Sequence, residues 1–261
     1  MKKRNPIIAL AQIRYFDSYE KNNVEKIKKY IRLAKKKNAD IICFPESCIH
    51  KLDFLPFDHK LIEEIKKECK KNSIWCIISD DMAIGRKIYN AAILINREGK
   101  IEGSYKKIHL YGDNKGVRAG RKIKVFKTDF AKIGIAICWD LAYPKLFKKM
   151  KLKGAEIVFC PTYWKYELQA HHARKYEEKH KNREKGTLKS LLMARAFENL
   201  FFVALCNPAN GEKDLISYSA ICSPHKILSD INSKEGLIYS HVDLSEIEKL
   251  QKLYDPSRII N

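Results

Sequence analysis

Short apolar runs alternate with amphipathic segments along almost the whole chain, and this alternation limits the possible folds more than any other feature. The apolar runs have the length and flanking turn residues of strands, whereas the amphipathic segments have apolar residues at helical spacing. We predict strands over residues 6–13, 40–44, 73–79, 89–96, 101–110, 123–126, 131–137, 156–160, 200–206, 217–222, 226–228 and 236–242. We predict helices over residues 17–37, 61–71, 145–153 and 187–199, and from about residue 244. The pattern indicates an α/β fold in which two mixed sheets lie between outer helices.

The sequence shows no internal boundary. At 261 residues the chain is long enough to bury a large core, and no linker-like stretch or internal repeat divides it. We therefore expect one domain over residues 1–261. No stretch reads as a membrane span or a signal peptide. The eight cysteines are scattered, without a CxxC pair or zinc-like spacing, which favours a reducing, cytoplasmic location.

The chain is strongly basic, with 51 Lys and Arg against 31 Asp and Glu and a formal net charge of +20. Such a balance can indicate a polyanionic partner. The lysines, however, are spread over predicted helix faces, where solvation explains them, so we do not expect a nucleic-acid partner. The basic segment 165–189 has three possible roles: a lid over a cleft, a phosphate-contacting patch or an oligomer contact. Its histidines lack the spacing of a metal site, and we predict a solvated face for His171, His172 and His180.

Three predicted strands end at or near a residue that can carry chemistry, namely Glu46, Lys107 and Cys138. Strand ends on one rim of a sheet converge in space, so these side chains can meet. Each also has a purely structural interpretation, as a turn cap, a surface lysine and a small core residue, respectively. Alternation along its strand places Lys107 on the same face as Tyr105 and His109. We expect His109 to make a structural hydrogen bond near the site.

These residues lie within short segments whose order and approximate spacing form a recognisable set. The segments are Phe44–Glu46, Tyr105–Leu110 and Ile137–Pro144, followed by Gly154–Pro161, Ala194–Asn199 and Val203–Asn207. In these segments the sequence resembles the nitrilase, or carbon–nitrogen hydrolase, superfamily. The likeness runs from about residue 6 to about residue 258, which is almost the whole chain.

The resemblance implies a four-layer αββα sandwich with a catalytic triad of Glu46, Lys107 and Cys138. It also implies that subunits associate with one another and that no metal or organic cofactor is needed. Trp139 and Asp140, directly after the predicted nucleophile, are more similar to the amidase and N-carbamoylamine branches than to the true nitrilases.

The three residue types suit the hydrolysis of an amide, which needs a nucleophile, a proton carrier and stabilisation of an oxyanion. A thiol with a pKa near ~8.5 is only a few per cent thiolate at neutral pH. Lys107 can supply positive charge beside Cys138 and donate a hydrogen bond to the oxyanion. Glu46 can take the thiol proton, give it to the leaving amine and then deprotonate water. We expect the backbone N–H of Trp139 to be the second oxyanion donor.

Three neighbouring residues each have two interpretations. Many superfamily members carry a second glutamate after the lysine segment, and Asp113 takes that place here. It either supports Lys107 or caps a loop turn. Tyr163 and Trp164 follow a predicted strand and either line the substrate cleft or pack in the core.

Our leading hypothesis is a cytoplasmic, cysteine-dependent hydrolase of a small linear carboxamide or N-carbamoyl amine. The reaction would pass through a thioester and release ammonia, and the expected partners are the small-molecule amide and further copies of the chain. One alternative is a catalytically inactive basic protein on the same fold that binds a polyanion through segment 165–189. A second alternative is an acyltransferase that uses Cys138 with an acceptor other than water.

Overall fold

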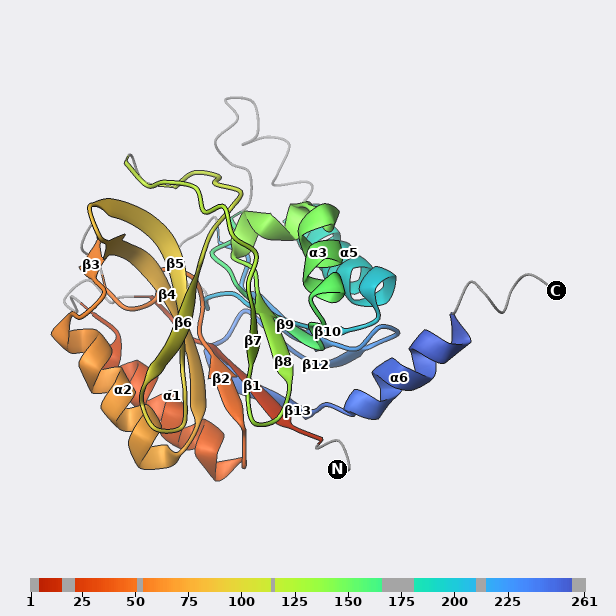
Figure 1. Cartoon of the computed structure of the whole chain (residues 1–261), viewed down its shortest axis with the longest axis horizontal. Helices are drawn as coiled ribbons and strands as arrows, with labels where there is room; N and C mark the ends of the chain where they lie inside the picture. Colours follow the sequence, from red (N-terminus) through yellow and green to blue (C-terminus); the bar gives the residue numbers. More distant parts are fainter. Residues whose placement is uncertain are drawn as a thin grey trace.

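Two mixed β-sheets lie face to face, and helices cover the outer face of each sheet (Figure 1). The structure is a computed structural model, and it describes residues 5–15, 22–50, 54–113, 116–165, 181–209 and 215–254. Within these residues no helix has the length and apolar character needed to cross a membrane. The order of the layers is helices, sheet, sheet, helices, so the predicted αββα sandwich is confirmed.

The first sheet has seven strands in the order β13-β1-β2-β4-β5-β6, with β3 beside β4. Its strands are β1 (Ile7–Gln12), β2 (Ile41–Cys43), β3 (Leu55–Pro56), β4 (Trp75–Ile84), β5 (Lys87–Ile95), β6 (Ile101–Lys106) and β13 (Gly236–His241). The second sheet has six strands in the order β12-β11-β10-β9-β8-β7. They are β7 (Val125–Lys127), β8 (Lys132–Ile135), β9 (Ile157–Pro161), β10 (Phe202–Cys206), β11 (Tyr218–Cys222) and β12 (Ile227–Asn232).

The helices divide between the two outer faces. They are α1 (Val24–Lys36), α2 (Lys60–Asn72), α3 (Pro144–Leu152), α5 (Lys181–Asn199) and α6 (Leu244–Leu253), with a short 3₁₀ helix η1 (Cys138–Ala142). Helices α1 and α2 pack on the first sheet, and α3 and α5 lie on the side of the second (Figure 1). Helix α1 shows why it packs there, because Val24, Ile27, Ile31 and Ala34 follow a helical period and all are buried.

The inner strands are buried on both faces. In β1, Ile8 and Leu10 join the core between the sheets, whereas Ala9 and Ala11 face the α1–α2 layer. This is the alternation expected of a strand with a period of two. Residues of β9 and β10 are buried throughout, which explains why these strands read as continuous apolar runs.

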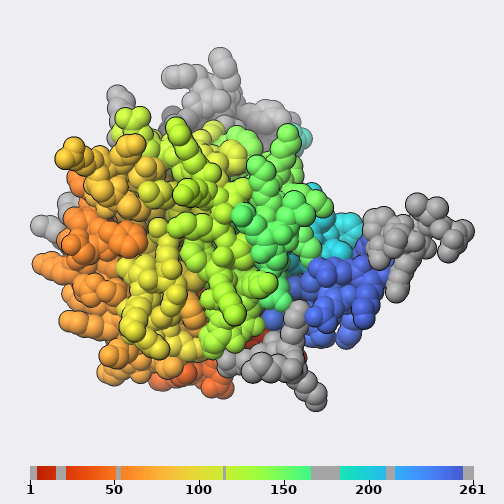
Figure 2. Space-filling view, viewed as in Figure 1, coloured from red at the N-terminus to blue at the C-terminus, as the bar shows by residue number. Residues whose placement is uncertain are grey.

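The edge strands β6 and β7 bring the two sheets together on one side of the molecule. Gly103 of β6 lies against Phe126 of β7, where an added Cβ would be 2.7 Å from the ring atom Cε1. Figure 2 shows the corresponding yellow and yellow-green surfaces in continuous contact. This closure keeps the segments that follow β6 and β8 near one another.

Several predicted boundaries are wrong in position; for example, the strand predicted over 73–79 extends to Ile84 and the helix predicted over 187–199 begins at Lys181. The helix expected over 17–37 begins at Val24, because Asn22 forms a β-bridge with His50, while residues 16–21 lie outside the described residues. The strand expected over 101–110 ends at Lys106. The chain beyond it turns, with Gly112 at a φ of +65°, and leaves the sheet.

Arg97, in the turn between β5 and β6, links the two sheets at one end. Its guanidinium lies 2.7 Å from Asp40, which precedes β2, and 3.0 Å from Asp129, in the turn between β7 and β8. It also donates to the carbonyl of Ser73 over 2.9 Å. Because Asp40 is buried, removal of the guanidinium takes a charged partner away from a carboxylate that water solvates poorly.

We predict that Arg97→Ala lowers the free energy of unfolding by about 1–3 kcal/mol, because a partly buried ion pair and a bond between the sheets are lost. Urea denaturation measures the change. The matched control is Lys100→Ala in the same hairpin, whose pair with Glu98 is exposed, and we expect it to leave the midpoint unchanged. Equal midpoints for wild type and Arg97→Ala would contradict the proposed link.

Candidate active site

Glu46 is held in a loop that runs between the two sheets after β2. Its backbone N–H donates to the carbonyl of Thr162 over 3.3 Å, and the N–H of Cys48 donates to the carbonyl of Ser79 over 3.2 Å. Ser47 between them has a φ of +53°, in the left-handed region. Glu46 itself is only 3% exposed. The carboxylate is therefore fixed at the point where the strand ends of both sheets meet.

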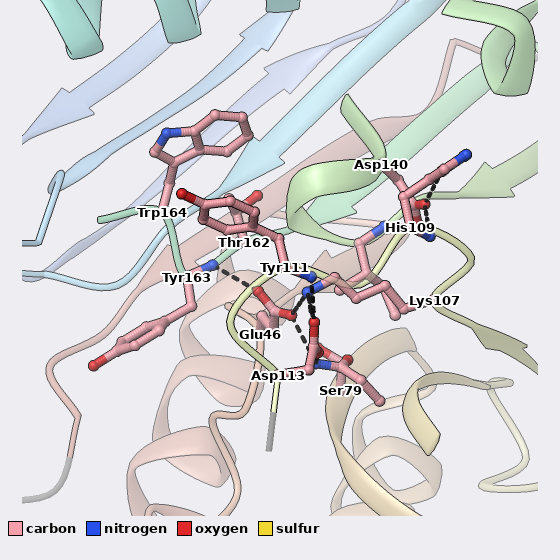
Figure 3. Close-up of polar contacts among 12 residues, drawn as sticks. Glu46, Ser79, Lys107, His109, Tyr111, Asp113, Asp140, Thr162, Tyr163 and Trp164 are labelled. Carbon is pink, nitrogen blue, oxygen red and sulfur yellow. Dashed lines mark hydrogen bonds and ion pairs between the residues drawn. The ribbon is translucent and has the colours of Figure 1, made fainter. Parts of the chain in front are cut away.

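Lys107 directly follows β6 and is buried beside that carboxylate (Figure 3). Its Nζ lies 2.9 Å from Glu46 Oε1 and 3.0 Å from Asp113 Oδ2. Burial by itself lowers the pKa of this ammonium, but the negative charge of Glu46, with Cys138 and Asp113, outweighs burial and raises the pKa above its usual value. Lys107 is therefore a permanent cation at neutral pH.

Cys138 follows β8 as the first residue of η1 and has a φ of +45°. Few residues other than glycine adopt this left-handed backbone, and it occurs where a fold holds a side chain in a set direction. Cys138 is 8% exposed, whereas the other seven cysteines are fully buried. Cys138 is thus the most exposed of the eight cysteines.

The pKa of the Cys138 thiol is raised well above its usual value. Burial is the main cause and the charge of Glu46 the next, while Lys107 and the backbone N–H of Tyr163 act in the opposite direction. These contributions also place Glu46, Lys107 and the Tyr163 backbone in the immediate surroundings of the sulfur. The structure thus brings together the three residues predicted from the strand ends.

Asp140, for which the sequence predicted no structural role, holds the turn after Cys138. Its fully buried carboxylate accepts bonds from the Tyr105 hydroxyl at 2.7 Å and from the N–H of Ile137 at 3.0 Å. It also contacts Nδ1 of His109 at 2.7 Å and accepts from the His109 N–H at 3.0 Å. The expectation that His109 makes a structural hydrogen bond near the site is confirmed. The signal for Asp140 was its position in a buried segment, two residues after the cysteine.

Aromatic rings surround the nucleophile position. Trp139 stacks on Tyr111, with 4.4 Å between ring centroids, and its ring lies 5.4 Å from that of Trp164. Tyr163 stacks on Tyr15 at 4.9 Å, while its backbone N–H donates to Glu46 Oε2 over 3.0 Å. Trp164 is 7% exposed, and its ring lies beside that of Trp139, the residue after Cys138. Tyr163 contributes its backbone, a contact that the sequence did not predict.

Asp113 lies beside Lys107 and so takes the supporting position that was one of its two interpretations. It also accepts from the N–H of Tyr111 over 2.7 Å, so it stabilises the loop turn as well. Asn90, missed from the sequence, donates to both Glu46 Oε1 and Asp113 Oδ1. It is the one amide side chain within β5 (Lys87–Ile95), which is the available signal.

Much of the basic segment 165–189, including His171, His172 and His180, lies outside the described residues. Among the residues that are described, no group of three or more His, Cys, Asp or Glu side chains could hold a metal ion.

Comparison with known proteins decides the family. The family model described as carbon–nitrogen hydrolase matches residues 7–252. The chain belongs to the carbon–nitrogen hydrolase family. The resemblance to the nitrilase superfamily is confirmed, and the chain is a carbon–nitrogen hydrolase.

The relatives of this carbon–nitrogen hydrolase include named amidases. The chain is 27% identical over 245 residues to the 2-oxoglutaramate amidase of Bacillus subtilis (strain 168), with 88% of each chain covered. It is 31% identical over 180 residues to the N-carbamoylputrescine amidase of Arabidopsis thaliana, which covers 62% of this chain and 60% of the relative. It matches the fold of Saccharomyces cerevisiae Nit3, of the nitrilase superfamily, with a TM-score of 0.79, 21% identity and coverage of 97% and 96%.

A second buried carboxylate in this carbon–nitrogen hydrolase secures the loop that carries Glu46. Asp80 of β4 accepts from the N–H groups of Ile49 at 2.9 Å, His50 at 3.3 Å and Asp81 at 2.9 Å. Burial raises the pKa of Asp80 to about 7, although these backbone donors act against the shift. The folded protein therefore binds this proton more tightly than the unfolded chain does.

We predict that Asp80 makes the stability fall as the pH rises. Its folded pKa of about 7 lies above the ordinary value of 3.8. The contribution of Asp80 to the free energy of unfolding is therefore complete below about pH 4 and is lost as the pH rises through about 7. The free energy of unfolding of wild type relative to Asp80→Asn should fall by on the order of 2–4 kcal/mol across that window. Urea denaturation between pH 4 and pH 8 measures it.

The control for this measurement is Asp243→Asn. Asp243 caps α6, and its hydrogen bonds with Ser245 lower its pKa. Its contribution to stability is therefore present at any pH above the ordinary pKa of an aspartate and is lost only in acid. That variant should run parallel to wild type from about pH 5 upward. If the free energies of unfolding of wild type and Asp80→Asn also run parallel between pH 4 and pH 8, the prediction for Asp80 is wrong.

Proposed function

We propose that this carbon–nitrogen hydrolase cleaves a small linear carboxamide or N-carbamoyl amine through a thioester on Cys138, with release of ammonia. The observation that carries the proposal is the buried Glu46–Lys107 pair, 2.9 Å apart, beside the thiol on its left-handed turn. A base, a cation and a sulfur nucleophile in one place are what amide hydrolysis needs.

In the first step Cys138 Sγ attacks the carbonyl carbon of the amide, and the thiol proton moves to Glu46. The raised pKa of the thiol supports this order, because a sulfur that rests protonated needs a base at the moment of attack. Glu46 is fixed by bonds to both of its oxygens, so it can receive the proton without a search for the right orientation.

The carbonyl oxygen becomes an oxyanion in the same step. Lys107 can stabilise it, because the raised pKa keeps the ammonium charged and burial keeps water from screening the charge. We assign the second donor to the N–H of Trp139. It is the second residue of η1, and the first N–H groups of a helix lack partners within that helix.

Collapse of the tetrahedral intermediate breaks the C–N bond. Glu46 returns its proton to the nitrogen, which leaves as ammonia or an amine, and the acyl group stays on Cys138 as a thioester. Glu46 then takes a proton from water as the hydroxide adds to the thioester carbonyl. Breakage of the C–S bond releases the acid and restores the thiol with the proton held by Glu46.

The substrate class is supported by the relatives. The names of two of them, 2-oxoglutaramate amidase and N-carbamoylputrescine amidase, state a primary amide and a carbamoyl amine as substrates of those proteins. Both are small linear molecules with a terminal carbonyl–nitrogen bond, which is the class proposed here. Self-association and a cytoplasmic location stay predictions from the sequence.

We predict that Cys138→Ala abolishes release of ammonia from every amide that wild type cleaves, because the variant has no nucleophile, and that the thermal midpoint changes little. A panel of linear amides and N-carbamoyl amines is assayed for ammonia, and intact mass detects the acyl adduct on wild type. Cys222→Ala, at a buried cysteine of β11, is the matched control and should retain activity. Turnover by Cys138→Ala equal to wild type would refute the proposal.

We also predict that Asp113→Asn lowers kcat by roughly 10- to 100-fold with a smaller change in KM, because Lys107 loses one of its two anionic contacts. Asp113→Glu keeps the charge and matches the residue that many superfamily members carry, and it should retain most of the activity. Steady-state kinetics on the best amide of the panel measures both. Full activity of Asp113→Asn would leave Asp113 with the loop-turn role alone.

A further inference from the structure

We propose that Asn90 is a positioning residue that gives the two carboxylate oxygens of Glu46 different roles. Oε1 is held as a fixed acceptor, and Oε2 is left to exchange protons with the thiol and the substrate. The inference rests on the proposed function, because it concerns the proton carrier of that reaction.

The sheet places Asn90 directly opposite Lys107. Ala91 of β5 pairs with Lys106 of β6, and the N–H of Lys107 donates to the carbonyl of Asn90 over 2.9 Å. Asn90 is 4% exposed, so its side chain lies inside the protein beside the Lys107 ammonium. At this buried position the amide nitrogen has hydrogen-bond partners, whereas Oδ1 has none among the described residues.

Those partners are two carboxylates. Asn90 Nδ2 donates to Glu46 Oε1 over 2.7 Å and to Asp113 Oδ1 over 3.0 Å. Both partners are acceptors when ionised, which fixes the amide with its nitrogen toward them. The two protons of the NH₂ group are thereby both used.

The ammonium of Lys107 donates to the same two oxygens, at 2.9 Å from Glu46 Oε1 and 3.2 Å from Asp113 Oδ1. Two donors and two acceptors thus form a closed ring of four hydrogen-bonded groups. Lys107 brings one positive charge against two negative charges, and Asn90 adds two donors without any charge. The ring therefore holds both carboxylates close together with one cation.

The ring occupies one oxygen of Glu46 and leaves the other outside the ring. Glu46 Oε1 receives Lys107 and Asn90, whereas Oε2 receives the N–H of Tyr163 over 3.0 Å. The same N–H acts on the Cys138 thiol, so Oε2 is the oxygen on the sulfur side. Without Asn90, Oε1 keeps Lys107 but loses its second donor, so a proton on Oε1 becomes less unfavourable relative to one on Oε2.

The test compares Asn90→Asp, Asn90→Ala and Asn90→Ser with wild type in steady-state kinetics over pH. We expect kcat to fall by roughly 10- to 100-fold in Asn90→Asp and Asn90→Ala, with KM changed less than threefold. The acid limb of the kcat/KM profile should move to higher pH, furthest in Asn90→Asp, which removes a donor and adds a negative charge. Asn90→Ser keeps a single donor and should lie between wild type and Asn90→Ala.

Asn96→Ala is the matched control. Asn96 is a buried asparagine of the same hairpin, and its amide also donates to a carboxylate, that of Glu102, at the opposite end of the strands. We expect Asn96→Ala to destabilise the hairpin without affecting the site. Its thermal midpoint should fall, and its profile of kcat/KM against pH should match that of wild type. The comparison separates positioning of Glu46 from a general weakening of the hairpin.

A second readout does not depend on any amide being turned over. Cys138 is the most exposed of the eight cysteines, so its alkylation by iodoacetamide can be followed by intact mass, with Cys138→Ala as the background. The rate of alkylation over pH should shift in the Asn90 variants and not in Asn96→Ala. If wild type cleaves no amide, the proposed function fails, and the alkylation profiles still decide the role of Asn90.

Profiles of Asn90→Ala and Asn90→Asp that coincide with wild type in kinetics, or in alkylation where no amide is cleaved, would overturn the inference. Loss of the folded state in all three variants, seen by circular dichroism, would overturn it as well, because Asn90 would then be a determinant of folding.

Discussion

The contact between the Lys107 ammonium and the Glu46 carboxylate is the interaction on which the rest of this structure depends. Both groups are almost fully buried, and a charge in that position is tolerable only when it is paired and hydrogen-bonded. Asp113, Asn90 and the Tyr163 backbone supply the remaining hydrogen bonds. Removal of any one member takes a buried hydrogen bond away from its neighbours, so the cluster is specified as a unit.

The pair can exist only because two sheets close on each other. Lys107 comes from the first sheet and Cys138 from the second, while the loop of Glu46 is bonded to both, at Thr162 and Ser79. Burial of the apolar core between the sheets stabilises the arrangement of these segments, but the core side chains have no role in the proposed reaction. The polar groups at its edge then select one arrangement of the loops. Apolar packing thus sets the relative position of the two sheets, and hydrogen bonds set the positions of the polar side chains in the site.

The sequence predicted the layers and the three central residues, because strand periodicity and strand ends are local features. It did not predict Asn90 or Asp140, whose roles arise from contacts across 44 and 31–35 positions of the chain. The start of the first helix was also misplaced, because a bridge from Asn22 to His50 competes with the local helical pattern. Tertiary contacts of this kind produce no periodic pattern in the amino-acid sequence. Asp113 shows the intermediate case, in which the sequence identified the residue and the fold shows its contacts with both Lys107 and the loop turn.

The proposed chemistry is compatible with two carboxylates beside one ammonium, because the charge of the site stays balanced. At rest, ionised Glu46 and Asp113 with Lys107 give a cluster charge of minus one. In the proposed first step Glu46 becomes neutral as it takes the thiol proton, and the substrate oxygen becomes negative at the same time. The net charge of the buried site is unchanged, so no new charge has to be desolvated. The Lys107 charge, until then shared with Glu46, is released toward the oxyanion when the oxyanion forms. Asp113 stays ionised throughout and keeps the ammonium in place as its other partner is neutralised.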